Sequence, residues 1–133
     1  MAGQARGYSG KPLYQKLGLK PGMTCRPVNP PVAYKSLVEG AEGISYPRKG
    51  PADLVHLFCR NRAELGAGIN AALADVAEGG MLWVSWPKKS SKLFVDLTED
   101  DLRTVILPTG WVDVKVCAVD ADWSGLKFVR RKK

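Results

Sequence analysis

Residues 54–58 read LVHLF and residues 81–86 read MLWVSW. Short, nearly continuous apolar runs of this kind are typical of strands that are buried on both faces of a parallel sheet. Between the two runs, Asn61 and Glu64 form an N-cap and capping-box pattern, which predicts the start of a helix. Apolar residues then recur at helical spacing, and a glycine pair is expected to end the helix: Leu65, Ile69, Leu73 and Val76, then Gly79 and Gly80. The centre of the fold is therefore predicted to be a strand–helix–strand unit.

The flanking segments extend this unit in both directions. On the N-terminal side, residues 23–28 predict a first strand and residues 34–39 a short helix. On the C-terminal side, Thr98 is expected to cap a helix, and residues 112–118 and 126–130 predict two strands in a hairpin. Two sets of apolar residues are expected to face the core: Leu102, Val105 and Ile106 of the helix, and Val112, Val114, Val116 and Ala118 of the strand. We expect a three-layer, Rossmann-like α/β fold with a mainly parallel sheet of about five strands and a C-terminal antiparallel hairpin.

Composition fits one folded domain. The 133 residues are 45% apolar and 25% charged, which is ordinary for a single globular domain. We expect one domain over residues 1–133, with a loose N-terminal arm (1–7) and a basic tail (130–133). No apolar run is long enough for a membrane span, and the N-terminus does not read as a signal peptide, so we expect a cytoplasmic protein with no membrane partner. The three cysteines have no metal-ligand spacing, which favours buried structural thiols and no metal site.

Several segments resemble class I S-adenosylmethionine (SAM)-dependent methyltransferases. Residues 17–23 (LGLKPGM) resemble the lead-in to the first strand of that family. Residues 53–55 (DLV) and 77–82 (AEGGML) resemble its fourth and fifth strands, and the terminal hairpin resembles its antiparallel ending. The resemblance implies a methyltransferase-like sheet.

The segment in the cofactor-binding position differs from that family. Where those enzymes have a glycine-rich loop after the first strand, residues 27–31 read PVNPP. Prolines remove backbone donors and stiffen the loop. Only the 23 residues from 30 to 52 separate the first strand from the next central one, which leaves room for one crossover. We therefore expect a truncated sheet that lacks the cofactor half, binds no cofactor, SAM included, and is not catalytic.

A closer resemblance covers nearly the whole chain. Residues 83–91 (WVSWPKKSS), 96–100 (DLTED), 112–120 (VDVKVCAVD) and 123–127 (WSGLK) resemble a small bacterial domain family that carries no assigned activity. This resemblance implies a bacterial protein and brings no site residues with it.

The carboxyl ends of the predicted parallel strands carry the candidate binding residues. Open α/β sheets bind ligands at this edge. Basic side chains and a helix N-terminus favour an anion there. The predicted ligand-binding residues are Asn29, Arg60, Asn61, Lys88, Lys89 and Ser90. The alternative interpretation is that Asn61 only caps its helix while the charges are solvated.

Other constellations have simpler explanations. His56, the only histidine, lies in an apolar strand and is expected to be a hydrogen-bonded core residue rather than a catalytic base. Acidic residues 96–101 surround the Thr98 cap, where they complement the helix dipole without a metal. The net charge of +7 and the four tryptophans leave open a stacking platform for nucleic acid.

Three functions follow from these patterns. The first is a non-catalytic, methyltransferase-like domain that binds an anionic small molecule or a protein partner. The alternatives are a reduced SAM- or nucleotide-dependent enzyme and a basic nucleic-acid accessory protein.

Overall fold

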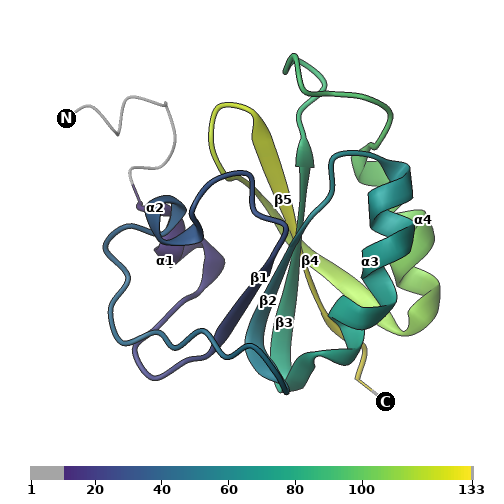
Figure 1. The fold of residues 1–133 in the computed structure, drawn as a ribbon. Helices are drawn as coiled ribbons and strands as arrows, with labels where there is room; N and C mark the ends of the chain where they lie inside the picture. The colour runs from purple at the N-terminus through teal and green to yellow at the C-terminus, as the bar shows by residue number, and fades with distance from the viewer. Residues whose placement is uncertain (1–10, 133) are drawn as a thin grey trace.

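The computed structural model describes residues 11–132 (Figure 1). The predicted N-terminal arm lies outside these residues. The elements in chain order are α1 (Leu13–Leu17), β1 (Cys25–Val28), α2 (Tyr34–Leu37), β2 (Ala52–Phe58), α3 (Arg62–Ala74), β3 (Val76–Pro87), α4 (Glu99–Ile106), the short 3-10 helix Leu107–Thr109, β4 (Trp111–Ala118) and β5 (Trp123–Arg130).

The strands form one mixed five-stranded sheet in the order β1-β2-β3-β5-β4. β1, β2 and β3 are parallel neighbours, and β5 pairs antiparallel with both β3 and β4. Figure 1 shows α3 and α4 on one face of the sheet and α1 and α2 on the other. The predicted α/β class with about five strands is confirmed. None of the helices within residues 11–132 has the length and apolar character needed to cross a membrane.

Two apolar clusters lie against the sheet. The cluster beneath α3 and α4 includes Leu65, Ile69, Leu102 and Ile106, and the cluster beneath α1 and α2 includes Leu17, Tyr34, Phe58 and Trp83. Because residues alternate along β2, Leu57 joins the first cluster and Phe58 the second. β2 and β3 are therefore buried on both faces, as their apolar runs predict.

β3 begins earlier than the sequence predicts. Val76, expected in the preceding helix, is the first residue of β3 and pairs with Ala52, and the register then shifts so that Leu54 pairs with Met81. Gly79 and Gly80 lie inside this irregular stretch instead of ending the helix. A Cβ at position 80 would lie 2.6 Å from the Asp53 carbonyl oxygen, so the close approach of the two strands requires glycine there.

The predicted basic tail begins inside the sheet. Arg130 ends β5, and its guanidinium donates hydrogen bonds to the carbonyl oxygens of Val76 (2.8 Å) and Ala77 (3.2 Å). The same group lies over the Trp111 ring, 4.7 Å from its centroid. Arg130 is exposed, and its guanidinium joins β5 to the start of β3.

Candidate functional site

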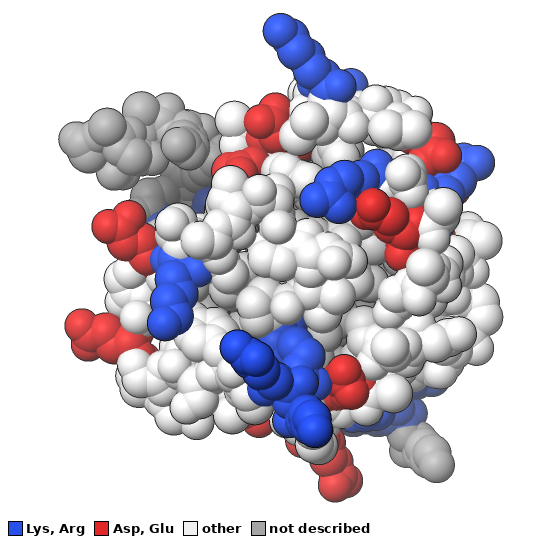
Figure 2. Space-filling view, viewed as in Figure 1, with Lys and Arg blue, Asp and Glu red and all other residues white. Residues whose placement is uncertain are grey.

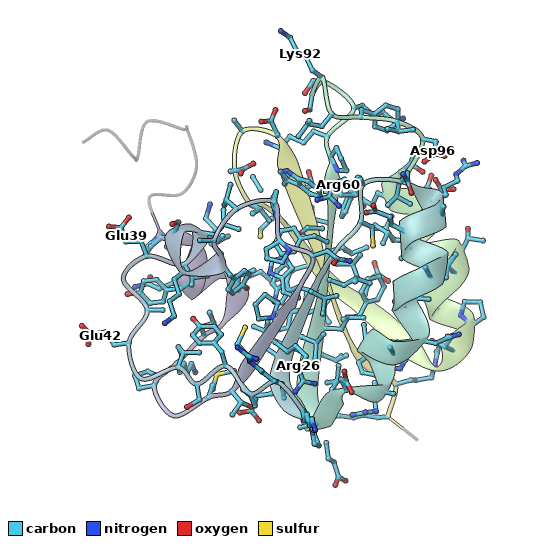
Figure 3. The ribbon with its side chains drawn as sticks, in the orientation of Figure 1. Arg26, Glu39, Glu42, Arg60, Lys92 and Asp96 are labelled. Atoms are coloured by element: carbon cyan, nitrogen blue, oxygen red, sulfur yellow. The ribbon has the colours of Figure 1, made fainter. Side chains whose placement is uncertain are left out.

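The three parallel strands end at the same edge of the sheet. Val28, Phe58 and Pro87 close β1, β2 and β3, and the predicted binding residues follow them. Figure 3 shows Arg60 at this edge. In Figure 2, acidic and basic side chains lie close together at the same end of the molecule, which is the upper end of the view.

Arg60 and Asn61 are engaged in starting α3. The Asn61 Oδ1 accepts a hydrogen bond from the Glu64 backbone N–H at 2.9 Å, which confirms the predicted cap. The Glu64 carboxylate turns back and accepts from the Arg60 backbone N–H at 2.8 Å, and it lies 3.3 Å from the Arg60 guanidinium. The positive charge of Arg60 is thus already matched by Glu64. The contact between Asn61 and Glu64 agrees with the alternative interpretation, in which Asn61 only caps the helix.

Asn29 is not grouped with the two lysines. It is exposed and adopts a left-handed backbone conformation with φ of 57°, a region that asparagine tolerates better than most residues. It follows β1, which is separated from β3 by β2. The prediction joined all six residues into one site, whereas the sheet order places Asn29 two strands away from Lys88 and Lys89.

Lys88 and Lys89 line a cavity of about 370 Å³ at the carboxyl end of β3, which we call the β3 cavity. Its described lining is Trp86, Lys88, Lys89, Thr98, Glu99, Asp100 and Ser124. The volume lies at the lower end of the range that small-molecule sites occupy. Ser90 is exposed and does not line it.

The segment that carries the lysines is held by the turn between β4 and β5. The Lys88 backbone N–H donates to the Asp122 carbonyl oxygen at 2.8 Å, and the Ser91 hydroxyl lies 2.9 Å from the Asp122 carboxylate. These contacts fix the backbone beside Lys89. The cavity wall on this side is therefore anchored to the sheet.

The opposite wall is the first turn of α4. Thr98 and Asp101 form a complete capping box, in which the Thr98 hydroxyl accepts from the Asp101 N–H and the Asp101 carboxylate accepts from the Thr98 N–H. The Thr98 backbone N–H, followed by the Arg62 side chain, lowers the pKa of Asp101. Asp101 is thus explained by capping, as the sequence predicts for the acidic cluster.

Two other acids of this turn face the β3 cavity. Glu99 pairs with Arg103 at 2.6 Å. Asp100 lies 3.5 Å from the same arginine, and its side chain is 94% exposed. The cavity is consequently lined by two lysines and by two carboxylates, and these carboxylates also contact the Arg103 guanidinium. Sequence reasoning missed this pairing because it treated the acids of α4 and the lysines after β3 as separate features.

His56 lies in the core beneath α2, as predicted. Its Nδ1 is 2.8 Å from the Tyr34 hydroxyl and its Nε2 is 2.7 Å from the Ser85 hydroxyl. The ring stacks on Phe58 with centroids 4.2 Å apart. Burial lowers the pKa of His56 to about 3, so the ring is neutral at physiological pH. The only histidine of the chain is therefore sealed away from any ligand.

The same region contains one of the buried thiols. Burial raises the pKa of the Cys25 thiol to about 12, although a hydrogen bond with Tyr34 opposes the shift. Cys59 is also buried, and burial followed by the charge of Glu64 raises its pKa to about 12. The prediction of buried thiols is confirmed for these two, whereas Cys117 is only half-buried.

Within residues 11–132, the tryptophans do not form an exposed stacking surface and no metal cluster is found. The four tryptophans are all buried, with at most 5% of any residue exposed, so they cannot form a stacking platform for nucleic acid bases. Within residues 11–132, no group of three or more histidine, cysteine, aspartate or glutamate side chains is placed to hold a metal ion.

Comparison with known proteins relates this sheet to one group of enzymes. No family model and no curated protein sequence matches the chain. Among solved structures, a SAM-dependent methyltransferase from Aquifex aeolicus superposes with a TM-score of 0.63 at 16% identity, covering 87% of this chain and 86% of the other. The chain has a methyltransferase-like fold. The resemblance of its strands to the class I enzymes is thereby supported, while the likeness to the small bacterial family rests on the sequence alone.

Two further structures contain SAH or SAM. Magnesium protoporphyrin IX methyltransferase from Synechocystis PCC 6803 with bound SAH superposes with a TM-score of 0.58 at 12% identity, covering 89% of this chain and 78% of that one. Fibrillarin from Aeropyrum pernix with natively bound SAM gives 0.55 at 11% identity, with 85% and 69% covered. The prediction that no cofactor is bound is wrong in the light of these neighbours, which point to SAM as a ligand to consider.

Two places at this edge of the sheet, the turn after β1 and the β3 cavity, differ in how well they fit such a ligand. After β1, Pro30 and Pro31 have no backbone N–H to offer, so this turn does not fit a carboxylate that needs backbone donors. The β3 cavity does fit a ligand with both charges, because Lys88 and Lys89 can meet a carboxylate while Asp100 can meet a cationic group.

Proposed function

We propose that the chain is a methyltransferase-like binding domain whose β3 cavity takes a small molecule with an anionic group and a cationic group. The observation that carries the proposal is the mixed charge of the cavity, with Lys88 and Lys89 facing Glu99 and Asp100. The buried indole of Trp86 adds an apolar wall. A cleft with a few convergent polar groups beside an aromatic ring is the usual form of a small-molecule site.

The proposed role is binding rather than acid–base catalysis. A general base that works near neutral pH is most often histidine. The only histidine here is fully buried between Tyr34 and Ser85 and remains neutral. The remaining groups of the cavity can orient a ligand through charge and hydrogen bonds.

SAM is the specific ligand that we place first. It carries a carboxylate, an ammonium and a sulfonium, which is the charge combination that the β3 cavity offers. The solved structures with bound SAM or SAH favour it over other zwitterions. Lys89 would hold the carboxylate and Asp100 the cationic centre, and SAM when bound supplies an electrophilic methyl group. A reduced SAM-dependent enzyme is therefore the second candidate function.

Isothermal titration calorimetry with SAM and with SAH tests the proposal. We expect SAM to bind with a dissociation constant in the micromolar range, about −7 kcal/mol. Lys89→Gln should weaken SAM binding about tenfold because it removes the charge that meets the carboxylate. Asp100→Asn should weaken SAM more than SAH, because SAH lacks the sulfonium charge.

The matched control is Lys49→Gln, which removes an exposed lysine before β2 at the opposite edge of the sheet. Binding by this variant should equal that of the wild type. No binding of SAM and none of SAH, or an equal loss in Lys49→Gln and Lys89→Gln, would overturn the proposal.

A further inference from the structure

A second cavity opens between α1 and β4, and we call it the α1–β4 groove. It measures about 330 Å³, and its described lining is Lys11, Gln15, Lys16, Lys115, Val116, Cys117 and Ala118. Three of these residues are lysines and none is acidic. The β3 cavity, in contrast, carries both charges.

The two cavities have no described lining residue in common. Cys117 packs against the apolar cluster beneath α1 and α2, whereas Trp86 belongs to the cluster beneath α3 and α4. Although Ala118 of the groove pairs with Ser124 of the β3 cavity, the lysines of the two cavities lie on different elements, Lys16 and Lys115 on α1 and β4, and Lys88 and Lys89 after β3. This separation allows each site to be tested without the other.

A fourth lysine increases the positive charge beside the groove. Lys127 lies directly opposite Lys115 in the antiparallel pairing of β4 and β5. Like charges directly opposite each other destabilise a strand pair. Burial, followed by the charge of Lys115, lowers the pKa of Lys127, in keeping with the position of the two lysines opposite each other. A bound anion would relieve this repulsion.

The walls of the groove are set by the core. The Trp83 indole N–H donates to the Leu17 carbonyl oxygen at 3.0 Å, which ties the end of α1 to β3. Gly18 closes α1 in a left-handed conformation with φ of 90°. On the other side, Cys117 is partly buried against the same core. Lys16 and Lys115 are thus carried by elements whose positions are fixed before any ligand arrives.

We propose that the α1–β4 groove is a second ligand site, which binds the phosphate group of a small molecule. Three lysines line it, two from the segment of α1 (Lys11 and Lys16) and one from β4 (Lys115), and Gln15 adds an uncharged side-chain amide. Lysine binds phosphate as a point charge, so several lysines without a carboxylate suit a compact dianion better than a monovalent carboxylate. The cavity beside β3 has no such excess of positive charge.

Amide NMR titration with inorganic phosphate and with pyrophosphate, at constant ionic strength, tests this proposal. We expect saturable shifts at Gln15, Lys16 and residues 115–118, and stronger binding of pyrophosphate than of phosphate. Lys115→Gln, an exposed position whose replacement leaves the core intact, should weaken pyrophosphate binding about tenfold. Shifts that also follow added chloride, without saturation, would overturn the site.

Two matched variants complete the design. Lys92→Gln removes an exposed lysine at the tip of the loop after β3, away from the groove (Figure 3). Lys89→Gln alters the β3 cavity only. Both should bind pyrophosphate like the wild type, and equal weakening in Lys92→Gln would overturn the proposal. Binding of an oligonucleotide without any binding of pyrophosphate would also contradict a small-molecule site. Failure of SAM to bind the β3 cavity would leave these results unaffected.

Discussion

On one face of the sheet, α3 and α4 supply helices of 13 and eight residues, whereas on the other face α1 and α2 supply five and four. The long helices cover their face with apolar side chains such as Leu65, Ile69, Leu102 and Ile106. The short ones leave most of the covering to connecting segments, and Figure 1 shows these loops around α1 and α2.

The face with short helices is joined to the sheet by buried polar contacts. His56 connects Tyr34 of α2 with Ser85 of β3, and Trp83 connects β3 with the end of α1. A helix of four or five residues is not stable by itself in water and needs tertiary contacts to hold it. Buried hydrogen bonds specify a single arrangement where apolar packing alone would not. In this protein, the short helices α1 and α2 therefore depend on individual hydrogen bonds for their position on the sheet, whereas α3 and α4 are held mainly by apolar packing.

The largest expected effect is at Trp83, on the face with short helices. Trp83→Ala should lower the free energy of unfolding by about 3–5 kcal/mol, because the side chain is fully buried and its N–H holds α1. Urea denaturation followed by circular dichroism measures this change. Val105→Ala, at a 40% exposed position on α4, is the control and should cost less than about 1 kcal/mol. Equal stability of Trp83→Ala and the wild type would contradict the assignment.

The second effect is the pH dependence of stability that His56 causes on the face with short helices. The pKa of His56 in the folded protein is about 3, below the ordinary value of 6.5 in the unfolded chain. The unfolded state therefore binds the extra proton as pH falls from 6.5 towards 3, and stability should fall by up to about 1.4 kcal/mol per pH unit from this group. Above pH 7 the histidine should contribute no pH dependence.

Two measurements check this expectation. The ring signals of His56 should not titrate in NMR spectra between pH 8 and 5. His56→Gln should show a shallower loss of stability between pH 6.5 and 4 than the wild type. A ring that titrates near pH 6.5 in the folded protein would show that the site is open to water.

The smallest effect is expected at the helix cap on the other face. Thr98→Ala should lower the free energy of unfolding by about 0.5–2 kcal/mol, because it removes the hydroxyl that caps α4. Thr98→Ser keeps that hydroxyl and should stay close to the wild type. Thermal denaturation of the three proteins measures the difference, and an unchanged midpoint in Thr98→Ala would show that packing alone starts the helix.

Much of the α3–α4 face could be predicted from the sequence, because the helix caps and the spacing of apolar residues there agree with how the helices pack on the sheet. The Thr98 cap and the burial of Leu102 and Ile106 follow the predicted helix. Val105, predicted on the same buried face, is 40% exposed, because α4 buries a narrower stripe than its apolar residues suggest. Val76 was predicted in the helix after Asn61 but begins β3, because an apolar residue at helical spacing also suits the start of a buried strand.

β4 shows why alternation alone is not enough. Val112 lies opposite Val129, but the register shifts between Asp113 and Lys115, so that Val116 lies opposite Leu126. Directly opposite residues share a face, and the extra residue moves every later side chain to the other one. Val114 and Val116 are consequently half-exposed instead of buried together. A bulge depends on pairing with a distant strand and has no local signature here.

The positions of the candidate residues could be predicted from the sequence, but their neighbours in the fold could not. Lys88 and Lys89 follow β3 as expected, because parallel strands end at one edge. Arg60 was assigned to ligand binding, although Glu64, which was read only as part of a cap, neutralises it. Glu99 and Asp100 join the lysines through the packing of α4 beside β3, and sequence spacing does not reveal that contact.

A crystal structure of the protein grown with SAH is the most direct test of the proposed binding function. The account predicts the ligand in the β3 cavity, with its carboxylate beside Lys89 and its thioether sulfur, which takes the place of the SAM sulfonium, towards Asp100. Ligand bound after β1, at Asn29 and the following prolines, with the β3 cavity empty, would contradict it.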